Sequence, residues 1–122
     1  MITLYDELRY LGIESHYLFH PVPIEGTHRF RMPIRDFLDF AKLLTSSGEI
    51  PGRSKPMFSL MTDIGKVTLY DGCLGEKDSE GFYDIYTGYR LEERRKWHKG
   101  YVLPNSASIG EDGLIKVKYL DG

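Results

Sequence analysis

Apolar residues recur every three or four positions in two stretches near the N-terminus, a spacing typical of helices. The first stretch predicts a short helix over residues 4–11, with Thr3 as its N-cap and Gly12 as its stop. The second predicts a longer helix from Pro33 to Ser46, because proline in the first turn loses no intrahelical hydrogen bond. The apolar face of this longer helix contains Ile34, Phe37, Leu38, Ala41, Leu44 and Thr45.

Further apolar residues widen this face of the longer helix. Phe40 and Leu43 lie beside it, so the helix is expected to pack on two sides or to present a surface to a partner. Three phenylalanines of this region are assigned to the core, namely Phe30, Phe37 and Phe40.

From residue 57 onward the pattern changes to the alternation of polar and apolar positions that is typical of strands. Strands are predicted at 57–62, 66–70, 82–87, 101–103, 107–109 and 114–120. Residues 13–19 and 28–32 also have strand-like patterns, and Asp112-Gly113 is a strong hairpin turn. The segments without either pattern are the loops 50–56 and 71–81 and the ambiguous stretch 89–99.

This order of elements indicates an α+β fold. We expect two N-terminal-half helices packed on a C-terminal antiparallel sheet, or on a small barrel, of about five short strands. The 122 residues contain no repeat, low-complexity tract or linker, so a single globular domain over 1–122 is predicted. A folded monomer of this length is expected to expose roughly 6,700 Å² of surface.

The net charge and the lack of targeting signals indicate where in the cell the protein is expected. Sixteen basic and eighteen acidic residues leave a net charge of −2, so no overall field draws the chain to nucleic acid or to a membrane. The N-terminus does not resemble a secretory signal, and no apolar run reaches the length of a membrane span. Cys73 is the single cysteine. We therefore expect a cytoplasmic protein, in a cell or in a host cell, with no membrane contact.

The histidines and the cysteine give little sign of catalysis. On a strand, His16 and His20 would lie about 13 Å apart, too far to share one metal ion. Acidic neighbours would raise the pKa of the Cys73 thiol, so a partly buried small residue in a turn is favoured over a nucleophile. The sequence also contains no phosphate-binding glycine motif and no nucleophile elbow. The prediction is therefore a protein that is not an enzyme, with no metal site and no cofactor.

Residues 71–84 contain five carboxylates and three glycines. Their spacing does not match the calcium loop of an EF-hand. A solvated loop, or a contact surface for a basic partner, is the favoured interpretation.

Aromatic and basic residues are concentrated in segment 82–101. The chain has nine Tyr, six Phe and one Trp, an unusual share, and five of its Tyr and Trp residues lie here beside five basic ones. Tyr, Trp and Arg are enriched at protein-interface hot spots, and aromatics beside cations also bind single-stranded nucleic acid. Alternatively, the aromatics fill the core beside a solvated basic turn. The predicted binding residues are Tyr86, Tyr89, Arg90, Arg94, Arg95, Lys96, Trp97 and Tyr101.

These features favour a small non-catalytic protein-binding module, such as an inhibitor, an adaptor, or a subunit of a larger assembly or homo-oligomer. A chain of this kind also fits the small accessory proteins of phages and mobile elements. The alternative is a protein that binds nucleic acid or a nucleotide phosphate through the same segment, which the near-zero net charge weakens. A small metal-dependent hydrolase ranks third.

Overall fold

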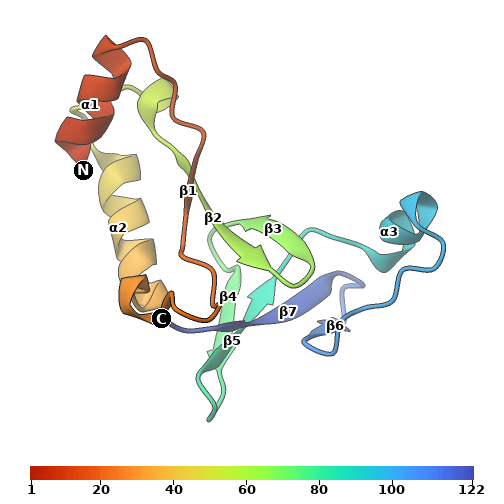
Figure 1. Cartoon of the computed structure of the whole chain (residues 1–122). Coiled ribbons are helices and arrows are strands. Elements are labelled where there is room, and N and C mark those ends of the chain that lie inside the picture. The colour runs from red at the N-terminus through yellow and green to blue at the C-terminus, as the bar shows by residue number, and fades with distance from the viewer.

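The computed structural model describes residues 1–122 and has the predicted α+β fold class (Figure 1). Its helices are α1 (Ile2–Tyr10), α2 (Ile34–Ser46) and α3 (Leu91–Trp97), with two 3₁₀ turns, η1 (His28–Phe30) and η2 (Gly52–Ser54). Its strands are β1 (Tyr17–Phe19), β2 (Met57–Thr62), β3 (Gly65–Thr68), β4 (Leu74–Lys77), β5 (Phe82–Tyr86), β6 (Ala107–Ile109) and β7 (Ile115–Leu120).

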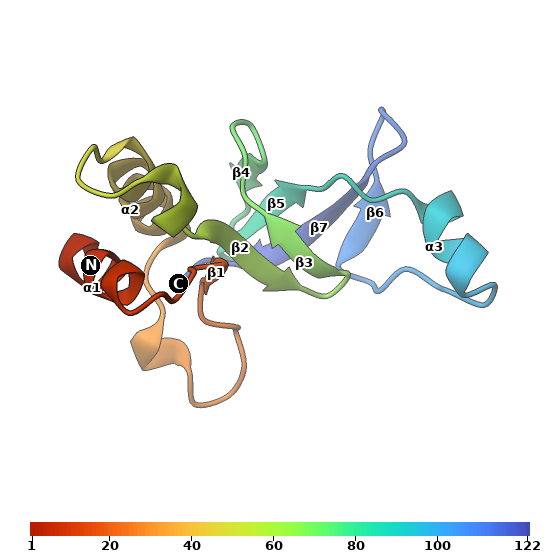
Figure 2. The same ribbon diagram turned by 90° about the horizontal axis from the view of Figure 1, so that it is seen from above.

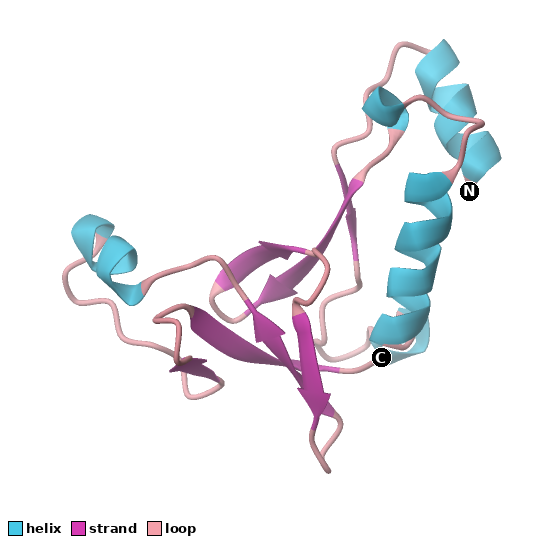
Figure 3. Ribbon diagram, turned by 180° about the vertical axis from the view of Figure 1, so that it is seen from behind, coloured by secondary structure: helices cyan, strands magenta, loops and turns pink.

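The strands form two sheets rather than one. The first has the order β1-β2-β3 and the second the order β4-β5-β7-β6. All pairs are antiparallel except β1 and β2, which are parallel, with Tyr17 opposite Met57. Helices α1 and α2 lie at one end of the molecule and α3 at the other, with the sheets between them (Figures 2 and 3).

Helix α2 packs against the first sheet through the face that the sequence predicts. Ile34, Phe37 and Leu44 are buried, and the ring of Phe37 lies 5.3 Å from that of Phe58 on β2. Phe40 is half-buried, and its ring lies 5.9 Å from the same Phe58 ring. The core then continues through both sheets as Leu60, Ile64, Val67, Tyr83, Ile85, Ile115, Val117 and Tyr119.

Asp121 joins three distant parts of the chain. Its Oδ1 accepts a hydrogen bond from the backbone N–H of Ile34 at 2.7 Å, and its Oδ2 lies 2.8 Å from Lys77 Nζ. No side chain near the start of α2 caps that helix, so this remote carboxylate takes the place of an N-cap. Burial alone would raise the pKa of Asp121, but the hydrogen bonds from Lys77, Ile34 and Gly122 outweigh burial and lower it.

We expect Asp121→Ala to lower the free energy of unfolding by about 1–2 kcal/mol at pH 7, because the helix loses its cap and Lys77 its partner. The carboxyl pKa is lower in the folded state than in the unfolded state, so this contribution is present above about pH 4 and is lost below it. Urea unfolding at pH 7 and at pH 3 measures both effects. Asp39→Ala, which removes an exposed carboxylate of α2, is the control.

The prediction of a strand at 28–32 is wrong. This segment contains the 3₁₀ turn η1, in which the backbone N–H of Phe30 donates to the carbonyl of Thr27 at 2.9 Å. Phe30 is 63% exposed, so its assignment to the core is wrong as well. The alternating pattern was misleading here because no neighbouring strand covers the apolar positions.

Three other local predictions are corrected. Segment 71–81 is not entirely loop, since it contains β4, which pairs with β5. The two strands approach closely at Gly75, where a Cβ would lie 2.9 Å from the Asp84 carbonyl oxygen. Residues 101–103 form no strand. Met1 rather than Thr3 precedes α1 as its N-cap residue, without a side-chain hydrogen bond, whereas Gly12 has the positive φ of 73° expected after a helix.

The structure exposes more surface than its length predicts. The accessible area is 8259 Å², which exceeds the expected monomer value by about 1,500 Å². Many large apolar side chains are more than one-third exposed, among them Tyr10, Leu11, Ile24, Trp97 and Val102. A standard protein interface covers about 800 Å² on each partner, so the excess is large enough for one or two such contacts.

Candidate functional site

Helix α3 lies in the segment that the sequence leaves ambiguous. Glu92 and Glu93 occupy its first turn and Arg94, Arg95 and Lys96 its last turn, an order that complements the helix dipole. Glu92 and Lys96 form no ion pair, although their spacing would allow one. The dipole and tertiary contacts together therefore support this short helix.

Arg94 is the main link between α3 and the sheets. Its Nη2 donates to the carbonyl oxygen of buried Ile64, at the β2–β3 turn, at 2.5 Å. Its guanidinium lies 4.2 Å from the ring centre of Tyr89 and 5.7 Å from that of Tyr101. The Tyr89 hydroxyl in turn donates to the carbonyl of Lys66 at 2.5 Å. Arg94 is half-buried, so its contacts are mainly internal.

Trp97 has the opposite character, since 92% of its surface is exposed at the end of α3. It borders an open hollow of about 490 Å³. The other residues that line this hollow are Tyr89, Arg90, Glu93, Arg94, His98 and Tyr101. An indole left in water at this level offers a large apolar area to a partner.

The structure therefore brings together five of the eight predicted binding residues, namely Tyr89, Arg90, Arg94, Trp97 and Tyr101. Arg95 and Lys96 are exposed on the same helix. Tyr86 lies apart from this group, beside a different hollow formed with Gly110, Glu111, Asp112 and Lys116. The alternative that the aromatic residues fill the core holds for Tyr83, which is buried, but not for Trp97, which is exposed.

The basic side chains around α3 have no internal acidic partners. None of Arg90, Arg95, Lys96 and Lys99 forms an ion pair, and all four are exposed. Together with Trp97 we call these residues the α3 surface, which surrounds the short helix, since Arg90 and Trp97 line the same hollow and Arg95 lies about 200° around the helix from Trp97. Their four positive charges exceed the two negative charges of Glu92 and Glu93. This surface combines an apolar anchor with positive charges that are free to meet an acidic group.

The acidic segment 71–84 is partly neutralised within the fold. Lys118 Nζ lies 2.8 Å from Asp78 Oδ2 and 3.6 Å from Asp84 Oδ1. The hydrogen bond from Lys118, helped by the backbone N–H groups of Phe82 and Glu80, lowers the pKa of Asp78. Asp78 and Asp84 thus hold the β4–β5 hairpin against β7, whereas Asp71, Glu76 and Glu80 are exposed and form no ion pair.

The histidines and Cys73 do not converge. His20 is fully buried, whereas His16 and His28 are exposed, and no group of three or more His, Cys, Asp or Glu side chains is arranged to hold a metal ion. Cys73 is fully buried, whereas the sequence predicts only partial burial, and burial raises the pKa of its thiol.

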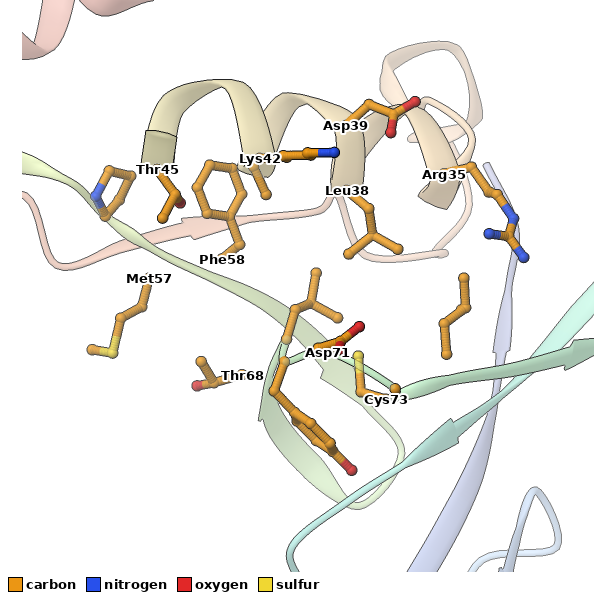
Figure 4. Close-up of a pocket in the computed structure, with 16 residues that line it drawn as sticks. Arg35, Leu38, Asp39, Lys42, Thr45, Met57, Phe58, Thr68, Asp71 and Cys73 are labelled. Atoms are coloured by element: carbon orange, nitrogen blue, oxygen red, sulfur yellow. The ribbon is translucent and has the colours of Figure 1, made fainter. Parts of the chain in front are cut away.

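A further hollow lies in a place that no pattern in the sequence indicates. It is an open groove of about 800 Å³ between α2 and the segment from β3 to the start of β4 (Figure 4). Its lining combines residues 35–45 with residues 56–74. No local pattern relates these two stretches, so only the fold reveals the groove.

None of the helices combines the length and the apolar character that a membrane span requires. Comparison of the chain with protein-family models, with curated proteins and with solved structures gives no match.

Proposed function

We propose that the chain is a non-catalytic protein-binding module that binds an acidic region of a partner through the α3 surface. The observation that carries this proposal is the 92% exposure of Trp97 among basic side chains without ion pairs. Tryptophan and arginine dominate the energetics of protein interfaces, and unpaired cations steer an acidic partner to the site. The excess exposed area supports the same function.

A protein partner fits this site better than single-stranded nucleic acid does. Binding of a single strand uses several exposed aromatic rings on which successive bases stack. Here the Arg94 guanidinium already lies over Tyr89 and faces Tyr101, so among the tyrosine and tryptophan rings of the group only that of Trp97 is freely exposed.

We expect Trp97→Ala, alone or combined with Arg95→Ala, to weaken partner binding at least tenfold while the melting temperature stays within about 2 °C of wild type. The full chain is used to capture partners from the source cell, and titration calorimetry with the purified partner then gives the affinity. Tyr10→Ala is the matched control, because Tyr10 is 77% exposed on α1 at the opposite end. Equal loss in both variants would contradict the assignment.

The nucleic-acid alternative is tested with the same proteins. A labelled single-stranded oligonucleotide is titrated at low and at moderate salt. If the wild type binds it and Trp97→Ala does not, the nucleic-acid function replaces the proposed one. Absence of binding at low salt removes that alternative.

A further inference from the structure

The three-stranded sheet β1-β2-β3 has apolar residues on both of its faces. The strand register places seven residues on the outer face, away from α2: Tyr17, Phe19, Met57, Ser59, Met61, Lys66 and Thr68. The alternate residues Phe58, Leu60 and Val67 are buried in the core. Figure 4 shows this division on β2, where Phe58 points toward α2 and Met57 lies on the opposite side of the strand. The inner face is therefore covered and the outer face is open.

The outer face is more apolar than a sheet face in water usually is. Four large apolar side chains occupy it, and each is 37–47% exposed: Tyr17, Phe19, Met57 and Met61. A solvated sheet face normally has polar residues at these alternate positions. Met61 also borders a hollow with Val22 and Ile24, two further exposed apolar residues. A second apolar layer would remove this area from water, as it does between the sheets of a sandwich.

The outer face is also nearly neutral. Lys66 is the one charged residue among the seven, and its Nζ lies 3.8 Å from the centre of the Tyr17 ring. The hydroxyls of Ser59 and Thr68 lie within hydrogen-bond distance of each other, at 3.4 Å, so they keep a partner when water is removed. A face with a single charge can therefore meet an identical face without strong repulsion.

The exposed area of the chain is sufficient for such a contact. It exceeds the value expected for a monomer by about 1,500 Å², of which a standard contact at the α3 surface would cover about 800 Å². The remaining area of about 700 Å² is close to what each copy contributes to a standard dimer.

We propose that the outer face is a homodimer interface, in which the sheets β1-β2-β3 of two copies pack face to face about a two-fold axis that crosses β2 near Ser59. Each strand then lies over its own copy in the opposite direction, so Met57 of one protomer faces Met61 of the other. An axis along the strands would instead place the apolar β1 over β3, whose outward residues are Lys66 and Thr68. Sheets packed in this way lie about 10 Å apart, and flexible methionine side chains fill the space between them well.

The dimer is independent of the α3 surface, since the two share no residue. It has a consequence for binding that does rest on the proposed function. A dimer presents two α3 surfaces, so it would hold a partner with two acidic regions more tightly than a single copy does.

Sedimentation velocity on the full chain tests the dimer. We expect a concentration-dependent shift to twice the monomer mass, with a dissociation constant below about 100 µM. Met61→Lys, which places a charge in the apolar interface, should raise that constant at least tenfold. Leu43→Lys is the matched control, because Leu43 is 59% exposed on α2 and lies outside the outer face. Both residues are exposed, so neither variant should change the circular dichroism spectrum.

A pair of charges tests the two-fold arrangement. Met57→Glu alone should weaken the dimer as Met61→Lys does. The double variant Met57→Glu with Met61→Lys places opposite charges across the interface twice, so its dissociation constant should be at least fivefold lower than that of either single variant. Trp97→Ala should leave the dimer unchanged, so failure of the α3 surface and failure of the dimer are distinguishable.

Four results would overturn this interface. One is a chain that stays monomeric well above about 100 µM. Another is equal weakening by Met61→Lys and Leu43→Lys. A double variant that associates no better than the single variants would contradict the axis across the strands. The last is a different protein that the monomeric wild type captures from the source cell and Met61→Lys does not, which would assign the face to that protein.

Discussion

Replacing His20 with alanine is expected to lower the free energy of unfolding by about 2–4 kcal/mol at pH 7. The fully buried ring lies 2.7 Å through Nε2 from the carbonyl oxygen of Met32, so Nε2 carries the proton. Nδ1 is then the acceptor for the Tyr119 hydroxyl at 3.0 Å, and the ring packs 5.3 Å from that of Phe37. Alanine removes both hydrogen bonds and leaves a cavity between Phe37 of α2 and Tyr119 of the second sheet.

Urea unfolding monitored by circular dichroism measures this loss. The control is His28→Ala, which removes an exposed histidine and should change the free energy of unfolding by less than about 0.5 kcal/mol. If the two variants were equally stable, the hydrogen bonds of His20 to Met32 and Tyr119 would not stabilise the fold.

The same residue makes stability depend on pH. Burial lowers the pKa of His20, and the charge of Arg31 adds to this effect, whereas the Met32 carbonyl and Asp121 oppose it. An unfolded histidine has a pKa of about 6.5, so just below that pH the unfolded state binds a proton that the folded state does not. Stability should therefore fall below about pH 6.5, by up to about 1.4 kcal/mol per pH unit, until the folded pKa is reached. In His20→Ala this slope between pH 6.5 and 5 should disappear, well above the range in which Asp121 titrates.

Elements that are set by their own sequence pattern were predictable. The helix predicted at 33–46 is α2, the strand at 57–62 is β2, and the hairpin at 107–120 is the β6–β7 pair. In α2, β2 and β7 apolar residues at the right period are buried where the pattern expects them, whereas Ile109 on β6 is 50% exposed. The hairpin also has Gly113 with a φ of 78°, a conformation that suits glycine.

Elements that depend on distant partners were not predictable in this way. Strand β4 is mostly polar and exists through its pairing with β5 and the contact of Lys77 with Asp121, 44 residues away. His20 looks like an ordinary polar residue until the fold brings Tyr119 to its ring, 99 residues further along the chain. Such contacts leave no periodic trace in the sequence.

The candidate site also has features that the sequence predicts and others that only the folded structure determines. Composition alone located the aromatic and basic segment, but not which of its cations face solvent. Arg94 and Arg95 are neighbours in sequence and point about 100° apart around α3. One therefore reaches the Ile64 carbonyl, whereas the other has only a 3.4 Å contact with the carbonyl of Tyr101. That direction decides which residue supports the helix and which is available to a partner.

Arg94→Ala is accordingly expected to release α3 from the sheets and to lower the free energy of unfolding by about 1.5–3 kcal/mol, the range for hydrogen bonds to charged groups. The substitution leaves the carbonyl of buried Ile64 without its donor and removes the cation over the Tyr89 ring. Amide hydrogen exchange in residues 91–97 should accelerate at least tenfold, and partner binding at the α3 surface should weaken although Trp97 is intact.

Two variants separate this supporting role from a direct contact with a partner. Arg94→Lys keeps the charge but loses the planar group that lies over Tyr89, so it should give an intermediate increase in exchange. Arg95→Ala should leave exchange and stability close to wild type and weaken binding alone, because its side chain is exposed and weakly held. If Arg94→Ala weakened binding with no change in exchange at 91–97, Arg94 would be a contact residue and the anchoring of α3 would reside in Tyr89 and Leu91 instead.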